Sequence, residues 1–410
     1  MNRRRLLALA AVAAGASLLP GCSVGPTPTT GTPPRADAVV PPPDAGSAPL
    51  PSPVAPFAGR LNPRLGEPAE NLVWSPWSVA MVLAMIRAGA AGATASELSA
   101  VLGADADFDE RLADGWRRMA HATGEPLHAG NAVWAQRGLP WKQPFLDRLA
   151  ALAASLKDTD FAGGDPTKLA AEINAWVAGR TAGKITDLLS PSVLTPLTRM
   201  VLVNAVHFKA AWLSPLLPRP AGTFAAPAGA VRTPYLASGR ALAGRRSGGW
   251  TSALLPCEHG QFGLAVALAD DPDAAPADVP LPALTGIGSD GPRVLLTLPP
   301  WKDRFRAPLN DALAAAGMPS AFDEDRTDFS GMTDAQRLFL KLVVHEAVIE
   351  VDEKGIEAAA ATAGVMDQVS APVEPPIDLV LDRPFAYALV HLPTATPLFL
   401  GRVLDPAATP

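Results

Sequence analysis

One pair of residues begins a metal-binding motif without completing it. His345 and Glu346 match the first two positions of HExxH, in which two histidines bind zinc and the glutamate acts as a general base. Ile349 stands where the second histidine would be. Because a single imidazole does not hold a catalytic zinc, we expect no metal, and no other motif points to a cofactor.

A glycine motif typical of nucleotide binding occurs in the wrong context. Gly286, Gly288 and Gly291 match GxGxxG. A dinucleotide site needs a helix after the third glycine, because the helix N-terminus binds the pyrophosphate. Pro292 and the strand-like run RVLLTL follow here instead. The chain also lacks a phosphate loop of the form GxxxxGKS or GxxxxGKT, and no lysine completes the SxxK motif of β-lactamases.

Capping signals predict three helices in the first half of the chain. Ser75 and Asp165 each precede a proline, as an N-cap residue precedes the first helical position. Thr94 and Glu97 form a capping box for a helix between these two. Apolar residues follow the first and third signals at helical spacing: Val79, Val82, Leu83 and Ile86, then Leu169, Ile173, Trp176 and Val177.

Strands are expected mainly in the second half. The apolar run at 200–208 is typical of a centrally buried strand, and Ala347, Ile349 and Val351 occupy alternate positions among the acids of 345–353. Further strand-like runs lie at 262–268, 293–298, 377–381 and 397–404. Because helices dominate early and strands late, without βαβ alternation, the pattern predicts an α+β or multidomain class.

The N-terminus is typical of an export signal. Three arginines precede an apolar run from Leu6 to Leu19, which is too short to span a bilayer, and residues 1–21 are expected to be removed. The arginines resemble a Tat-type signal, and the residues before Cys22 resemble the lipobox of bacterial lipoproteins. The lipobox predicts lipidation of Cys22 and attachment to a membrane; a plain signal peptide is the alternative.

Composition predicts a tether between the leader and the folded part. Eleven prolines lie between Pro26 and Pro56, so 22–57 is expected to be an extended spacer, with the folded domain at 58–410. Of the chain's 34 basic residues, three lie in the leader, which leaves 31 against 40 acidic ones. This negative charge disfavours nucleic acid as a partner.

From about residue 61 to residue 406 the chain resembles the serpin family. Seven stretches carry the likeness in the family's order: 71–98, 173–189, 198–212, 328–332, 345–363, 382–385 and 399–406. The resemblance implies a metastable fold of three sheets and eight or nine helices, with an exposed reactive loop at about 355–376. It implies a monomeric protease inhibitor rather than an enzyme, with serine and sometimes cysteine proteases as targets.

Loop insertion into the largest sheet is the family's trapping step, and it requires small side chains. The expected hinge is Glu353, Gly355, Ile356, Glu357, Ala358, Ala359, Ala360, Ala361 and Thr362. Judged by propensity alone, Glu357 and the four alanines instead favour a short surface helix. Ile356 departs from the family, which usually has threonine there, and its bulk is expected to slow insertion. It is the main argument for the alternative function, a non-inhibitory serpin acting as a binding or chaperone-like module.

The family's spacing from Gly355 puts the reactive bond between Val369 and Ser370. A β-branched aliphatic residue before the cut fits the shallow apolar pocket of elastase-like proteases. No lysine or arginine lies between Gly355 and Asp382, which disfavours trypsin-like targets.

The resemblance also implies a polar cluster that controls sheet opening, formed by Ser75, Ser78, Asn204 and His345. Trp212 matches an aromatic residue near the point where the loop first inserts. The simpler alternatives are helix capping for Ser75, a satisfied core histidine for His345 and ordinary packing for Trp212. A basic group of Arg111, Arg117 and Arg118 is surrounded by acidic residues, which favours a mixed-charge face over a polyanion site.

Overall fold

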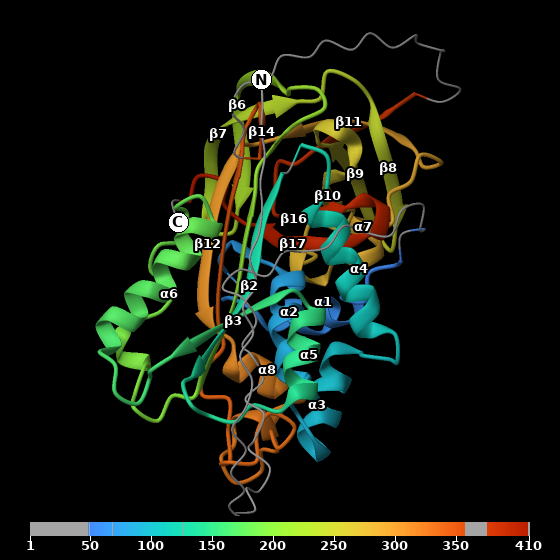
Figure 1. The fold of residues 1–410 in the computed structure, drawn as a ribbon. Coiled ribbons are helices and arrows are strands. Elements are labelled where there is room, and N and C mark those ends of the chain that lie inside the picture. Colours follow the sequence, from blue (N-terminus) through green and yellow to red (C-terminus); the bar gives the residue numbers. More distant parts are fainter. Residues whose placement is uncertain (1–47, 49, 68, 125, 357–374, 409–410) are drawn as a thin grey trace, which may run out of the picture. The chain divides into compact units, whose positions relative to one another are not determined.

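The computed structural model describes residues 48, 50–67, 69–124, 126–356 and 375–408, which belong to one structural unit, Pro33–Pro410. The described residues form eight α-helices and three sheets, so the predicted α+β class is confirmed (Figure 1). The helices are α1 (Ala55–Leu61), α2 (Pro76–Arg87), α3 (Gly92–Leu102), α4 (Phe108–Ala120), α5 (Gln143–Ala151), α6 (Pro166–Arg180), α7 (Leu281–Thr285) and α8 (Asn310–Ala316). In the part of the chain that the structure describes, no helix has the length and apolar character needed to cross a bilayer.

The largest sheet has ten strands. Their order is β1 (Leu72–Trp74), β17 (Thr396–Val403), β16 (Phe385–His391), β10 (Phe262–Ala269), β9 (Trp250–Pro256), β8 (Leu242–Ser247), β11 (Arg293–Leu298), β7 (Gly229–Ala237) and β6 (Leu217–Ala226). The tenth strand, β15 (Ile377–Val380), pairs in parallel with β11. The strands predicted at 262–268, 293–298, 377–381 and 397–404 are therefore all present.

Two smaller sheets complete the fold. One has the order β12 (Trp301–Pro308), β13 (Val344–Val351), β14 (Gly355–Ile356) and β5 (Ala210–Ala211). The other has the order β3 (Ala154–Thr159), β2 (Leu127–Gln136) and β4 (Met200–Phe208). Because only Lys209 separates β4 from β5, one chain segment links the two sheets. The strand predicted at 200–208 is thus confirmed, but in the described pairing it lies at the end of its sheet rather than at the centre.

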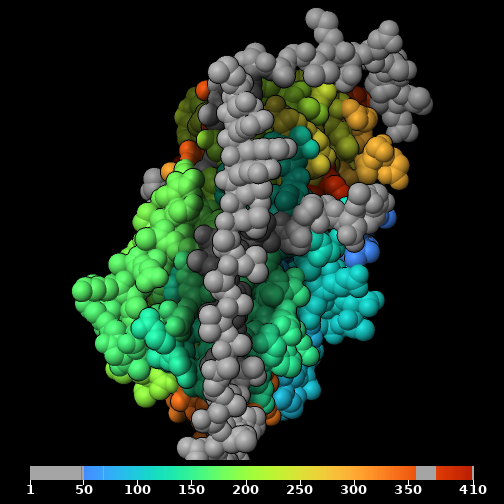
Figure 2. All heavy atoms as spheres, in the orientation of Figure 1, coloured from blue at the N-terminus to red at the C-terminus, as the bar shows by residue number. Residues whose placement is uncertain are grey.

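Helix α2 lies in the core, between the large sheet and β4. Nearly all of its residues are buried, and it packs against both β17 and β4. A helix that is apolar on every side must be buried in this way. At the surface, α6 covers the β2–β4 sheet and stands out in green in Figure 2. The N-terminus of α2 meets β13 through Ser75 and His345.

Two of the three predicted caps are confirmed. The Ser75 side chain accepts a hydrogen bond from the Ser78 amide at the start of α2. The Asp165 carboxylate accepts one from the Thr167 amide at the start of α6. Each side chain satisfies a helix N–H group that has no partner within the helix.

The capping box at Thr94 and Glu97 is wrong. Helix α3 begins two residues earlier, at Gly92, so Thr94 lies inside it. The Thr94 hydroxyl accepts a hydrogen bond from the Asp328 amide (3.0 Å), and Glu97 Oε2 accepts from the Ser320 amide (2.9 Å) and hydroxyl (2.7 Å). Both side chains therefore bind a distant segment of the chain, which competes with local capping.

The folded part begins earlier than residue 58. Val54 and Phe57 are fully buried, and α1 starts at Ala55. The Ser52 amide donates to the Thr394 carbonyl (2.8 Å), so the last residues assigned to the tether belong to the fold. The proline-rich composition hid this short helix. The leader, Cys22 and most of the predicted tether lie outside the described residues.

Candidate functional site

Strands β4 and β13 face each other across a cleft. Among the described strands, β4 pairs only with β2, and β13 only with β12 and β14. Residues 200–205 of β4 and 344–346 of β13 line one cavity of about 500 Å³. Val201 of β4 and Val348 of β13 also pack against the same apolar cluster, which includes α6 residues. We call this feature the β4–β13 cleft.

One end of the β4–β13 cleft is closed by β14. Ile356 pairs with Val351 of β13 on one side and with Ala210 of β5 on the other. Gly355 pairs with Ala211, and both β14 residues are buried. The first residues of the predicted loop therefore already form a short strand between β13 and the continuation of β4. Ile356 is only 2% exposed and belongs to the main core.

A tight turn leads from β13 into β14. Asp352 Oδ1 accepts hydrogen bonds from the amides of Lys354 (2.7 Å) and Gly355 (3.0 Å). The Trp212 indole N–H donates to the Asp352 carbonyl (2.9 Å), and its backbone amide donates to the Lys354 carbonyl (2.9 Å). Glu353 is exposed in the turn, where its carbonyl accepts from the Leu216 amide (2.9 Å). Trp212 thus lies beside the start of the loop and fixes the turn.

Three residues of the predicted polar cluster form one network at the start of α2. The Ser75 amide donates to His345 Nε2 (3.0 Å), and the Ser75 hydroxyl donates to the Leu398 carbonyl (2.6 Å). The Ser78 amide donates to the Ser75 hydroxyl (3.1 Å). Ser75 caps α2, which was the simpler alternative for this residue, and it also connects α2 to β13 and β17.

Asn204 lies on the opposite wall of the cleft and is not bonded to this network. Its amide N–H donates to Asn131 Oδ1 of β2 (2.6 Å), and Asn131 in turn donates to the Leu152 carbonyl (3.0 Å). Asn204 Oδ1 is buried and finds no partner in the described part of the chain. Sequence reasoning missed Asn131, although a lone amide in the middle of an apolar strand is a signal for a buried polar contact.

Burial controls the charge of His345. Burial lowers the pKa of this imidazole from 6.5 to about 4, because the charged form loses its hydration. The neutral ring keeps Nε2 as an acceptor for the Ser75 amide. Protonation would replace this acceptor with a second donor, so the network requires the uncharged histidine.

Residues 357–374 of the predicted loop lie outside the described residues. Among them are Glu357, Ala358, Ala359, Ala360, Ala361, Thr362, Val369 and Ser370. The chain is described again from Pro375, and β15 then pairs with β11 of the ten-stranded sheet. The predicted loop therefore leaves one sheet and returns to another.

The mixed-charge face is confirmed as internally paired. Arg111 bonds Asp105 (2.6 Å), and Arg118 bonds Asp114 (2.8 Å), whose side chain is almost buried. Arg111 also holds the pKa of the Asp105 carboxyl below its usual value. Arg111 and Arg118 therefore form ion pairs with carboxylates of the same protein.

Comparison with known proteins agrees with this architecture. The family model "Serpin (serine protease inhibitor)" matches residues 54–406. An uncharacterized serpin-like protein of Thermococcus kodakarensis is 33% identical, with 82% of this chain and 81% of the relative covered. Leukocyte elastase inhibitor A of Rattus norvegicus is 30% identical, with 85% and 97% covered. The solved structure "Cleaved Serpin 42Da" is 26% identical with a TM-score of 0.74, with 86% of this chain and 97% of that chain covered.

The fold and the cleft define an α+β protein in which the expected reactive loop begins as a short strand, β14, beside the β4–β13 cleft. The chain belongs to the serpin family, whose members are typically protease inhibitors.

Replacing His345 should change how stability depends on pH. The folded-state pKa is lowered, so the unfolded chain binds more protons between pH 6.5 and 4, and stability falls as the pH falls through that range. The loss is at most about 3 kcal/mol. His345→Gln keeps an acceptor but cannot titrate, so its thermal midpoint should fall less than that of the wild type between pH 7 and 4.

His391 needs to be considered in that comparison, because burial first, and then the charge of Arg118, lower its pKa to about 4 as well. It is present in both proteins, so its effect cancels. Equal pH dependence of the wild type and His345→Gln would contradict the assignment.

Proposed function

We propose that this protein is an exported serpin that traps extracellular serine proteases. The protease cleaves the loop and remains esterified to it through its serine, while the N-terminal part of the loop enters the β4–β13 cleft as a new strand. This cleft lies between the two smaller sheets, which the new strand would join, and not in the ten-stranded sheet, so the insertion site differs from the largest sheet expected from the sequence. The observation that carries this proposal is β14, where Gly355 and Ile356 already pair between β13 and β5. The backbone edges of β4 and β13 supply donors and acceptors for the residues that follow.

The register of β14 determines which loop residues would face the core. Ile356 is buried, so every second residue after it shares its side of the strand. In unbroken register these inward residues are Ala358, Ala360, Thr362, Gly364 and Met366. The first four are small, as insertion into a packed sheet requires. Met366 would come level with Met200 of β4 and Lys341, where the cleft widens into its cavity.

The bulk of Ile356 does not weigh against this mechanism. Its side chain is held in the apolar core beside Val351, so its position accommodates a β-branched aliphatic group. Burial of the side chain contributes roughly 1.5–3 kcal/mol to holding β14 in place. That Ile356 slows the first step of insertion stays a prediction, and the packing of its side chain in the core argues against it.

An elastase-like target is supported by the loop sequence and by one relative. Val369 precedes the expected cut, and no basic residue lies between Gly355 and Asp382. A similar protein of the rat is a leukocyte elastase inhibitor. The export signal and Cys22 would hold the inhibitor at the cell envelope or release it outside the cell, where such proteases act.

Incubation of the full chain with pancreatic-type elastase should give a covalent complex at the summed mass on a denaturing gel. The released C-terminal peptide should begin at Ser370, because the acyl bond forms at Val369. Trypsin should give no such complex. Loop cleavage by elastase without a complex would contradict trapping and favour a non-inhibitory serpin.

A charge at position 356 should convert the inhibitor into a substrate. Ile356→Asp would bury an unpaired carboxylate in the core, so the loop should insert too slowly to trap the acylated protease. The number of inhibitor molecules consumed per trapped elastase should rise roughly tenfold or more, as measured by active-site titration. Ile356→Thr, the family's usual residue, should keep trapping.

Lys354→Asp is the matched control, because Lys354 is exposed two residues earlier in the same turn. It should behave like the wild type. If Ile356→Asp traps elastase as efficiently as the control, insertion does not begin at this position.

A further inference from the structure

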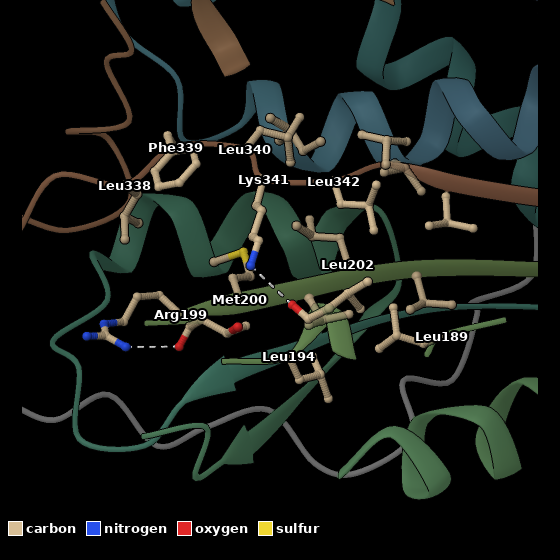
Figure 3. A pocket seen from close by; sticks show the side chains of 18 of the residues that line it. Leu189, Leu194, Arg199, Met200, Leu202, Leu338, Phe339, Leu340, Lys341 and Leu342 are labelled. Atoms are coloured by element: carbon tan, nitrogen blue, oxygen red, sulfur yellow. Dashed lines mark hydrogen bonds between the residues drawn. The ribbon is translucent and has the colours of Figure 1, made fainter. Parts of the chain in front are cut away.

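The end of the β4–β13 cleft away from β14 forms an apolar cavity. Its volume of about 500 Å³ lies within the range of roughly 300–1,000 Å³ typical of small-molecule sites. Figure 3 shows leucine and methionine side chains from β4 and from the segment before β13 turned toward the same space. The main apolar lining residues are Leu194, Met200, Leu202, Leu338, Leu340 and Leu342.

Unusually exposed apolar side chains stand at this cavity. Among the described residues, only five large hydrophobic side chains are classed as exposed, and two of them, Leu197 (81%) and Phe339 (41%), line it. Two apolar groups in contact with water at the rim of an apolar cavity are typical of a ligand-binding surface. A ligand with an aliphatic portion would remove both from water.

Two cations at the same cavity lack acidic partners. Within the described ranges, Arg199 donates to the carbonyls of Pro196 (2.7 Å) and Thr198 (3.0 Å), and Lys341 donates weakly to the Val193 carbonyl (3.5 Å). Neither forms an ion pair with any residue in the described ranges. In Figure 3 the Lys341 side chain points into the cavity toward Met200.

The acidic residues of the lining do not cancel this charge. Glu346 is fully buried and already bound to Arg304, with Arg306 at 3.8 Å. Glu324 is exposed, and a third cation, Arg337, also lines the cavity. An excess of positive charge therefore faces an apolar space, which favours a ligand with a single negative head and an aliphatic tail.

We infer that this cavity binds a free fatty acid. The aliphatic tail lies among Met200, Leu202 and Leu340, and the carboxylate accepts hydrogen bonds from Lys341 and Arg199. The tail contributes affinity through buried apolar area, and the charged head fixes its direction.

Bound fatty acid would also control inhibition; this part rests on the proposed function. In unbroken register the inserted loop brings Met366 level with Met200 and Lys341, so ligand and loop compete for one space. A ligand that binds the open cleft and not the filled one shifts the equilibrium away from insertion. Fatty acid should therefore turn the inhibitor into a substrate without affecting loop cleavage.

Isothermal titration of the full chain with laurate tests the site without any protease. Laurate should bind with a stoichiometry of one, and the double variant Arg199→Glu, Lys341→Glu should weaken binding roughly tenfold or more. Lys168→Glu, on the exposed surface of α6, is the matched charge control and should bind like the wild type. Dodecyltrimethylammonium, with the same tail and the opposite charge, should bind at least about tenfold more weakly.

Lys341→Gln keeps most of the side-chain length and tests the role of the cation even if the double variant does not fold. It should weaken laurate binding several-fold while the thermal midpoint stays unchanged. Absence of laurate binding, or equal binding of laurate and dodecyltrimethylammonium, would overturn the site. Equal binding by the wild type and Lys341→Gln would overturn the role of the cation.

A second arm separates the site from the proposed function. Laurate should raise the number of inhibitor molecules consumed per trapped elastase, and cleavage of the loop should abolish laurate binding. If elastase is never trapped but laurate binds with the predicted charge dependence, the proposed function fails and the site stands. If laurate still binds after the loop has been cleaved and elastase trapped, the competition is overturned.

Discussion

Backbone hydrogen bonding at the facing edges of β4 and β13 is the constraint on which the rest of this structure depends. A strand edge without a neighbour leaves a row of N–H and C=O groups that favours any strand able to pair with it. In the described chain, β2 and β12 pair with the outer edges of these two strands, and only β14 enters between them, next to β5. The loop that continues from β14 belongs to the same molecule, so its effective concentration at this edge is high.

The polar side chains around the cleft form two separate hydrogen-bond networks, one for each wall. Ser75 and His345 connect the β13 wall to α2, whereas Asn204 and Asn131 connect β4 to β2. Because no bond in the described part crosses from one network to the other, the two walls can move apart without breaking either. Trp212 fixes the turn before β14, and Ile356 of β14 pairs with Val351 of β13. The charge of His345 links this arrangement to pH.

Local signals in the sequence predicted much of this fold. The caps at Ser75 and Asp165 and the alternation across Ala347, Ile349 and Val351 arise from contacts within one element, so they can be read without knowing the fold. The capping box at Thr94 failed because its hydroxyl binds the distant Asp328 amide. That β4 pairs only with β2 among the described strands could not be predicted either, since an edge strand and a central strand can have the same apolar pattern. The cavity at Lys341 likewise depends on segments far apart in sequence.

Hydrogen exchange at the amides of β4 and β13 tests most directly whether the cleft receives the loop. The same protein is compared before and after cleavage of the loop by elastase, with exchange resolved by mass spectrometry of peptides covering 200–208 and 344–351. The account predicts that both peptides become strongly protected after cleavage, because the inserted strand pairs with both edges, while β10 in the large sheet stays unchanged. Unchanged exchange in 200–208 and 344–351 after cleavage would contradict the account.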